Sequence, residues 1–192
     1  MAKVYFKYGA MNSGKSTILL QTAHNYEELG HKVLIAKPKF DTKGNDRIVS
    51  RLGISRSADI LWEMGSDFSL ESFDLSHYAA LLVDEAQFLT KKQVDYLDRV
   101  VAKGANIPVL CFGLRTDYRG DGFEGSSRLL EIAESLEEIK TLCKCGKKAT
   151  RHLRRVNGEV DMDGDQIVID DNSAVEYLSV CGDCFYKEIG WT

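Results

Sequence analysis

The sequence predicts an α/β fold built on a mostly parallel sheet, followed by a small C-terminal lobe. Short apolar runs alternate with stretches of helical periodicity, which is typical of units that join parallel strands through helices. A glycine-rich loop lies between the first expected strand and the first expected helix. After about residue 140 the pattern changes to short strand-like pieces and two cysteine pairs. We therefore expect one domain at residues 1–140 and a lobe at residues 141–192.

Apolar runs and helical spacing place the individual elements. Strands are expected at residues 3–8, 33–36, 79–83 and 107–112. Helices are expected from Ser16 to a stop at Gly30, from the capping-box spacing of Thr90 and Gln93 to Gly104, and around Leu129 to Leu136. Residues 37–57 are polar and are expected to form a long loop, whereas Asn157-Gly158 is typical of a hairpin turn.

The loop after the first strand has the spacing G-x-x-x-x-G-K-S of a phosphate-binding loop, or P-loop. Its residues are Gly9, Ala10, Met11, Asn12, Ser13, Gly14, Lys15 and Ser16. Glycines let successive backbone N–H groups turn toward a phosphate, and the following helix adds its positive N-terminal end. In this pattern the lysine contacts the β- and γ-phosphates and the serine hydroxyl binds Mg²⁺. ATP and Mg²⁺ are therefore the expected ligands.

Two carboxylates end the continuously apolar run at residues 79–83. Asp84 follows the run directly and Glu85 comes next. An acid at the end of a buried parallel strand faces the phosphate loop and can hold Mg²⁺, directly or through water. Glu85 can serve as a base toward an attacking oxygen. The spacing leaves open whether that oxygen belongs to water or to a substrate hydroxyl.

Four cysteines near the C-terminus indicate a metal site. They are Cys143, Cys145, Cys181 and Cys184. Four thiolates from two turns can close a tetrahedral zinc site, and such a site has no open position for catalysis. We therefore expect a structural Zn²⁺. Cys111 lies in an apolar run and is expected to be buried as a small hydrophobic residue.

Charge and hydropathy exclude other partners. The net charge of −4 gives no overall attraction to nucleic acid or to an anionic membrane. No apolar run approaches the roughly 20 residues that cross a bilayer, and the N-terminal residues carry no signal-peptide pattern, so we expect a cytoplasmic protein. His152 lies among Arg151, Arg154 and Arg155, and because no aromatic residues are interleaved this cluster is expected to be a solvated hairpin face.

Together these motifs resemble the type II thymidine kinases over nearly the whole chain. The matching segments are Gly9 to Ser16, Asp84 to Phe88, Gly113 to Gly120, the two cysteine pairs, and Tyr177 to Cys181. The resemblance implies a P-loop NTPase core and a zinc-binding lobe whose lasso loop, between the cysteine pairs, closes over a nucleoside. The segment 168–177 is two residues longer than the family's version, and Asp170-Asp171 replaces paired glycines there. In the long loop, Asp41-Thr42-Lys43 has lysine where the family usually has arginine.

The resemblance also implies residue roles. Glu85 is the implied general base that takes the proton from the 5′-hydroxyl of thymidine, which then attacks the γ-phosphate of ATP to give dTMP and ADP. Ser16 and Asp84 are the implied Mg²⁺ ligands. The implied nucleotide site comprises Gly9 to Ser16 together with Asp84, Glu85, Ala86 and Gln87. The implied thymidine pocket comprises Met11, Phe88, Leu114, Tyr118 and Tyr177. Similar enzymes are homotetramers that are inhibited by thymidine triphosphate, dTTP.

Three other functions fit parts of the same pattern. A nucleic-acid-dependent ATPase with a zinc ribbon carries the same loop, acidic pair and cysteines, and Glu85 would then activate water. A nucleotide-regulated assembly protein uses ATP only to switch conformation. A kinase for a different nucleoside or nucleotide also shares the phosphate loop. The net charge of −4, the lack of a basic-aromatic stripe and the short chain count against the nucleic-acid-dependent ATPase. Only the resemblance of the lasso and the pocket favours thymidine over another nucleoside or nucleotide.

Overall fold

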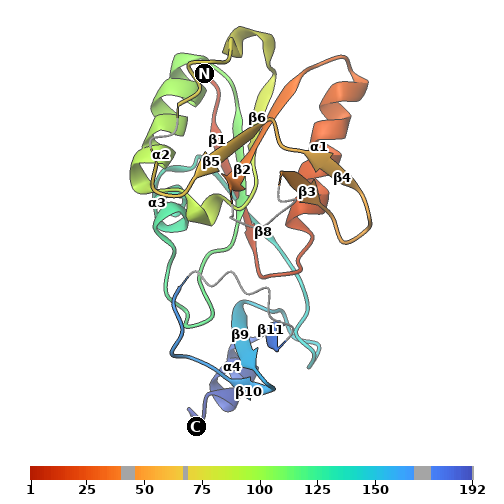
Figure 1. Cartoon of the computed structure of the whole chain (residues 1–192), viewed down its shortest axis with the longest axis vertical. Helices are drawn as coiled ribbons and strands as arrows, with labels where there is room; N and C mark the ends of the chain where they lie inside the picture. Colours follow the sequence, from red (N-terminus) through yellow and green to blue (C-terminus); the bar gives the residue numbers. More distant parts are fainter. Residues whose placement is uncertain (40–45, 67–68, 167–173, 192) are drawn as a thin grey trace.

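The computed structural model describes residues 1–39, 46–66, 69–166 and 174–191 (Figure 1). Two regions follow one another along its longest axis (Figure 1). The larger holds a six-stranded sheet with helices on both faces, and the smaller holds a three-stranded sheet and the C-terminal helix. The domain boundary at residue 140 stays a prediction.

All six strands of the large sheet run parallel, in the order β5-β2-β6-β7-β1-β8. The strands are β1 (Val4–Gly9), β2 (Val33–Lys39), β5 (Ile60–Glu63), β6 (Ala80–Val83), β7 (Val109–Gly113) and β8 (Ser135–Ile139). Every residue of β6 and β7 is buried. Burial on both faces explains why these two strands are apolar without alternation, as the sequence predicted.

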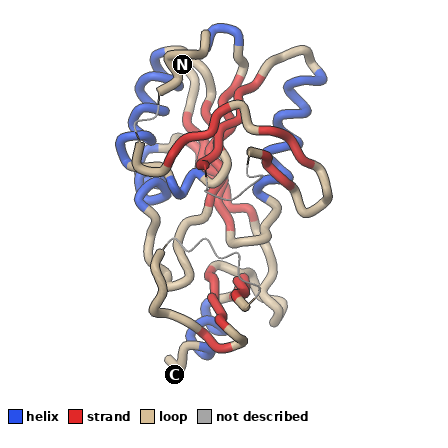
Figure 2. The backbone as a smooth tube through the Cα atoms, in the orientation of Figure 1, coloured by secondary structure: helices blue, strands red, loops and turns tan. Residues whose placement is uncertain are grey.

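Helices cover both faces of this sheet (Figure 2). On one face α1 (Lys15–Glu28) buries Leu19, Leu20 and Ala23 against the sheet. The other face is covered by α2 (Lys91–Tyr96), its π-helical continuation η3 (Leu97–Gly104) and α3 (Glu124–Ile132). The predicted capping box is present: the Thr90 hydroxyl accepts from the Gln93 N–H at 3.2 Å, and the Gln93 side chain accepts from the Thr90 N–H at 2.8 Å.

The parallel arrangement gathers three chain segments at one edge of the sheet. Strands β1, β6 and β7 are neighbours and run in one direction, so Gly9, Asp84 and Leu114 follow strand ends on the same side. Ligands of open α/β sheets bind at this carboxyl edge. Short 3₁₀ helices, η1 (Leu75–His77) and η2 (Ala86–Phe88), complete the connections.

Two expectations about secondary structure were wrong, and one strand was missed. The long loop expected at residues 37–57 contains the hairpin β3 (Arg47–Val49) and β4 (Ser55–Ser57), and β2 extends into its start. Strand β5 was not predicted. The helix expected to reach Leu136 ends at Ile132, and Leu136 lies half-exposed on the edge strand β8. Leu136 of the strand happens to continue the helical spacing of Leu129 and Ala133, which explains the wrong helix end.

The second sheet is antiparallel, in the order β10-β9-β11. It consists of β9 (Arg151–Val156), β10 (Glu159–Val160) and β11 (Val175–Val180), followed by α4 (Gly182–Glu188). The predicted turn joins β9 to β10, with φ of 54° at Asn157 and 86° at Gly158, the signs that a two-residue hairpin turn needs. The lasso residues 167–173, including the Asp170-Asp171 departure, and the Asp41-Thr42-Lys43 segment lie outside the described residues. Among the helices described, none is long and apolar enough to cross a membrane.

Candidate functional site

The phosphate loop leaves β1 at Gly9 and enters α1 at Lys15. A Cβ at Gly9 would lie 2.5 Å from the Ile139 carbonyl oxygen and 2.6 Å from Ser13 Oγ, so only glycine fits there. Asn12 and Gly14 have φ of 63° and 88°, in the left-handed region. These two residues turn the chain so that the loop wraps round the N-terminal end of α1, where its partial positive charge favours an anion.

Lys15 folds back over the loop that carries it. Its Nζ donates to the carbonyl oxygen of Ala10 at 2.9 Å, and the Gly9 carbonyl oxygen lies 3.4 Å away. The side chain is buried, and this burial lowers the pKa of Lys15, while the nearby carboxylates of Glu85 and Asp84 oppose the shift. The lysine is therefore held at the loop between its carbonyl groups and the two acids.

Asp84 lies beside the start of α1. Its Oδ2 accepts from the Ser16 hydroxyl at 3.1 Å, and its Oδ1 is buried with no hydrogen-bond partner among the described residues. Burial, with the neighbouring charge of Glu85, raises the pKa of Asp84 to about 7. A buried carboxylate oxygen without a partner, next to a hydroxyl, is the kind of oxygen ligand that Mg²⁺ prefers. The two predicted Mg²⁺ ligands thus meet, and they fit the ion.

Glu85 has a left-handed backbone, with φ of 51°. Such a conformation is uncommon for a residue with a side chain and often marks a functional site. Gln87 holds Glu85 in place, because its Nε2 donates to Glu85 Oε2 at 2.6 Å while its Oε1 accepts from the Leu114 N–H at 3.0 Å. A Cβ at Gly113 would lie 2.8 Å from that Oε1, so glycine there gives Gln87 its room.

A cavity of about 540 Å³ opens at this edge of the sheet. It is lined by the phosphate loop and first turn of α1, by residues 49–52, and by Glu85 and Leu114. The phosphate loop, Glu85 and two residues of the predicted thymidine pocket, Met11 and Leu114, therefore face one space. The contribution of residues 49–52 was missed, because these residues belong to the hairpin that the sequence did not predict.

The other three predicted pocket residues each pack against another aromatic ring. Phe88 packs edge-on against Phe123, with ring centroids 5.6 Å apart, and Tyr118 packs edge-on against Tyr177 at 6.4 Å. Tyr118 is buried, and the Arg154 guanidinium lies over its ring at 5.6 Å. Phe88, Tyr118 and Tyr177 are not among the residues that line the cavity.

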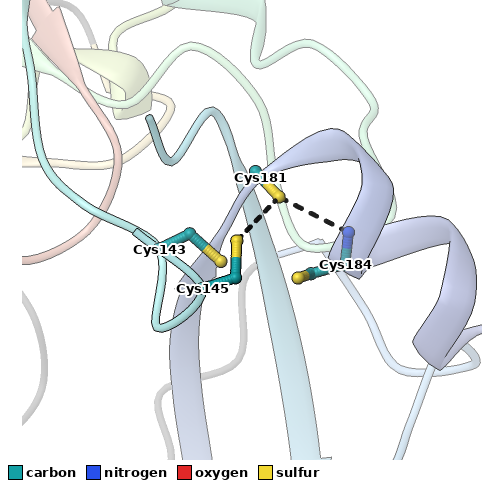
Figure 3. A group of neighbouring side chains, drawn as sticks. All are labelled: Cys143, Cys145, Cys181 and Cys184. Atoms are coloured by element: carbon teal, nitrogen blue, oxygen red, sulfur yellow. Dashed lines mark hydrogen bonds between the residues drawn. The ribbon is translucent and has the colours of Figure 1, made fainter. Parts of the chain in front are cut away.

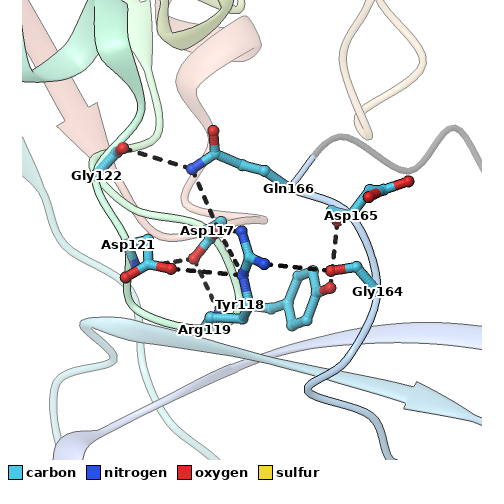
Figure 4. Close-up of polar contacts among 8 residues, drawn as sticks. All are labelled: Asp117, Tyr118, Arg119, Asp121, Gly122, Gly164, Asp165 and Gln166. Carbon is cyan, nitrogen blue, oxygen red and sulfur yellow. Dashed lines mark hydrogen bonds and ion pairs between the residues drawn. The ribbon is translucent and has the colours of Figure 1, made fainter.

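Polar contacts join the segment after β7 to residues 164–166 (Figure 4). The Tyr118 hydroxyl donates to the Asp165 carbonyl at 3.2 Å, and Gln166 Nε2 donates to Asp117 Oδ2 at 3.3 Å and to the Gly122 carbonyl at 3.4 Å. Asp117 in turn accepts from the backbone N–H groups of Arg119 and Asp121, both at 2.9 Å. One buried aspartate therefore holds both this turn and the side chain of Gln166.

The four cysteines of the two predicted pairs converge (Figure 3). All four Sγ atoms lie within 4.8 Å of one another, a group that could hold a metal ion. Cys181 caps α4, where its Sγ accepts from the Cys184 N–H at 3.5 Å, and the Cys145 and Cys181 sulfurs are 3.6 Å apart. A set of four sulfur atoms fits Zn²⁺ in a closed structural site. Cys111 is fully buried on β7, as expected.

The basic cluster on β9 differs from its prediction. His152 and Arg154 are buried, not solvated. Arg154 pairs with Asp161 and stacks on Tyr118. His152 Nε2 accepts from the backbone N–H of Met11 at 2.9 Å. No sequence pattern indicates this contact, because it joins residues 141 positions apart.

The fold and the site define a nucleotide-binding protein of the P-loop class. A parallel sheet presents a phosphate loop, a lysine and two acids at one edge, next to a cavity. The thymidine kinase family model matches residues 2–185, nearly the whole chain. The chain belongs to the thymidine kinase family.

Similar proteins named thymidine kinase cover almost the full length. The protein of Chromobacterium violaceum is 46% identical over 98% of this chain and 100% of its own. That of Pasteurella multocida is 48% identical over 98% of both chains. That of Legionella pneumophila (strain Lens) is 43% identical over 94% of this chain and 88% of its own. The family resemblance predicted from the motifs is thereby confirmed.

Proposed function

We propose that this chain transfers the γ-phosphate of ATP to the 5′-hydroxyl of thymidine, giving dTMP and ADP, with Glu85 as the general base. The assignment of the reaction rests on membership of the thymidine kinase family. One observation supports the assignment of the base: Glu85 lines the same cavity as the phosphate loop. Its carboxylate is held by Gln87, which leaves one carboxylate oxygen available for a substrate hydroxyl.

The phosphates of ATP bind the loop from Gly9 to Ser16, with Asp84 to Gln87 completing the nucleotide site. Backbone N–H groups of the loop and the Lys15 ammonium neutralise the transferring phosphate, so that catalysis is mainly positioning and charge compensation. Ser16 and Asp84 hold Mg²⁺, which when bound offsets the negative charge between the β- and γ-phosphates. The partnerless Asp84 Oδ1 supports this placement.

The thymidine base lies beyond Glu85, between Met11, Leu114 and the aromatic residues Phe88, Tyr118 and Tyr177. The lasso closes over it and excludes water that would otherwise intercept the phosphoryl group. Backbone groups that read the pyrimidine edge discriminate well, because a wrong base leaves buried polar groups unpaired. The contacts of Tyr118 with Asp165 and of Gln166 with Asp117 support a lasso that begins beside the segment after β7.

A structural Zn²⁺ on the four cysteines anchors both ends of the lasso lobe. We further propose that the enzyme acts in the cytoplasm as a homotetramer and that dTTP inhibits it by occupying the active site. Nucleic acid and membranes are not partners in this proposal. The burial of Arg154 and its pairing with Asp161 support this, because a buried, paired arginine is not available to a phosphate backbone.

A panel of nucleosides incubated with Mg-ATP tests the proposal. Formation of dTMP and ADP in equal amounts from thymidine, with little product from purine nucleosides, is the expected result. A parallel reaction with single-stranded DNA in place of nucleoside measures ATP hydrolysis. Hydrolysis stimulated by DNA, without phosphorylation of any nucleoside, would instead identify a nucleic-acid-dependent ATPase and overturn the assignment.

A further inference from the structure

Two residues of the C-terminal sheet reach across to the phosphate loop. His152 on β9 and Ser179 on β11 are directly opposite in the antiparallel register, so their side chains share one face of the sheet. His152 Nε2 accepts from the Met11 N–H at 2.9 Å, and the Ser179 hydroxyl donates to the Met11 carbonyl at 2.6 Å. Figure 1 shows this sheet facing the loop at the end of β1. Met11 is thus held on both of its backbone polar groups.

The Met11 carbonyl belongs to the peptide unit that precedes Asn12, whose φ is 63°. The left-handed region is uncommon for a residue with a side chain, even though asparagine enters it more often than most, so contacts from the surroundings help to hold this turn. The hydrogen bond from Ser179 fixes the orientation of that peptide unit. The turn closes with the Ser13 N–H donating to the Ala10 carbonyl at 3.2 Å, and the N–H groups that face a phosphate come directly after it.

The chemical state of His152 suits its contact with the loop. An imidazole nitrogen accepts a hydrogen bond only when it carries no proton, so His152 must be neutral with its proton on Nδ1. Burial first, and then the charge of Lys15, lower the pKa of His152 to about 4. His152 is therefore neutral throughout the physiological range, and it acts as a constant acceptor.

We propose that His152 and Ser179 are positioning residues, a clamp that holds the phosphate loop in its nucleotide-binding conformation by fixing Met11. The inference rests on the proposed function in one respect, namely that this loop binds the phosphates of ATP. The clamp makes the C-terminal lobe part of the ATP site, although the lobe contributes no residue to the phosphate loop motif. The lobe thereby serves both substrates, through the lasso for the nucleoside and through the clamp for the nucleotide.

The clamp also connects the cysteine site to the phosphate loop. Cys181 lies two residues beyond Ser179, at the point where β11 meets α4. Ala10 of the loop packs in the same buried cluster as Cys143 and Cys181. A metal ion on these cysteines would therefore also fix the strand that carries Ser179, and the order of the lobe would reach the loop through the contacts with Met11 and Ala10.

Matched variants of the full-length, zinc-loaded protein test the clamp. Ser179→Ala removes the donor and Ser179→Thr keeps it, whereas His152→Leu removes the acceptor and His152→Gln keeps one. Calorimetric titration with Mg-ATP, without thymidine, measures the Kd. We expect Ser179→Ala and His152→Leu each to weaken binding about fivefold, the effect of one lost hydrogen bond, and the conservative partners to stay within about twofold.

The outcomes separate this inference from the proposed function. An unchanged Kd for Mg-ATP in both disruptive variants would overturn the clamp, as would equal weakening in the disruptive and conservative variants, since packing alone would then explain the loss. Thermal unfolding and zinc content of each variant show whether it is folded, and only folded variants are compared. Wild-type protein that binds Mg-ATP without phosphorylating thymidine would refute the proposed function and leave the clamp standing.

Discussion

The two regions of this molecule are stabilised in different ways. The parallel sheet is buried between helices, and its core consists of large apolar side chains such as Phe6, Leu34 and Phe112. The buried cluster of the C-terminal lobe is small and consists partly of the cysteines themselves. Its members are Ala10, Cys143, Ala149, Leu153, Val180, Cys181 and Phe185. A core of this size does not stabilise a fold unaided, so we expect the lobe to need a metal ion on its cysteines and contact with the larger region.

The two regions therefore suit different roles, a rigid site at the sheet edge and, in the proposed function, a movable cover in the lobe. The sheet edge that carries the phosphate loop and Glu85 has little freedom, which suits a site where charges must be placed accurately. The lobe is built round four cysteines that could hold a metal ion and round an antiparallel hairpin. In the proposed function it also carries the segment that covers the nucleoside. Perturbations of the sheet should therefore change chemistry or global stability, and perturbations of the lobe should change local order and substrate binding.

The largest effect on the reaction is expected for Glu85→Gln. The amide keeps the size of the side chain but cannot accept the proton of the 5′-hydroxyl, so kcat should fall by about 10² to 10⁴. The Kd for Mg-ATP should change little. Steady-state assay of dTMP formation and titration with Mg-ATP measure the two quantities. Activity retained in Glu85→Gln would contradict its role as base and would favour a protein in which ATP only switches conformation.

Removal of zinc should affect the lobe and spare the sheet. Small units that fold round zinc gain roughly 10 kcal/mol or more from the metal, so chelation or Cys181→Ser should remove amide protection from β9 and β11. Hydrogen exchange resolved by peptide is the measurement, and protection in β1 and β6 should persist. A matched Cys111→Ala variant controls for loss of a cysteine elsewhere. Simultaneous loss of protection in both regions would show that they unfold as one unit.

The sheet could be predicted from the sequence because its signals are local. A buried parallel strand such as β6 is apolar throughout, and the phosphate loop and capping box are motifs of eight residues or fewer. The hairpin of β3 and β4 was missed, since its strands are three residues long, mostly polar, and formed by few apolar contacts. Strand β8 was misassigned because an exposed edge strand lacks a continuous apolar pattern.

The candidate site, like the sheet, was predictable only in part. Ser16 and Asp84 were expected to meet, and they do, because parallel topology dictates it. The burial of His152 could not be predicted, since it depends on how the lobe packs against Met11, far away in the chain. A histidine among arginines is indistinguishable by pattern from a solvated cluster. The assignment of the thymidine pocket stays a prediction that the nucleoside panel tests.

Acid should weaken the junction of the two regions through His152. Its pKa is about 4 in the folded protein and about 6.5 when unfolded, so the unfolded state binds the proton more readily. The stabilisation is complete above the unfolded value and is lost as the pH falls from about 6.5 to about 4. Between pH 7 and pH 5 this amounts to roughly 2 kcal/mol of unfolding free energy.

Comparison with His152→Gln isolates this effect from other titrations. Lys15, Arg115, Asp117 and Glu138 also lie near the imidazole, and they are present in both proteins. Urea unfolding at several pH values should show a steeper loss in the wild type than in the variant. Parallel pH profiles for the two proteins would contradict a buried neutral histidine at this position.

The smallest effect is expected at the capping box of α2. Thr90→Ala removes the hydroxyl that accepts from the Gln93 N–H, and losing such a cap costs about 1 kcal/mol. Because this helix covers the face of the large sheet, the loss should appear in global unfolding by urea, with an unchanged slope and an unchanged Kd for Mg-ATP. Lys92→Ala, an exposed change on the same helix, is the matched control. A loss of amide protection confined to residues 91–104 would show instead that the larger region also unfolds locally. The two regions would then differ only in how readily they unfold.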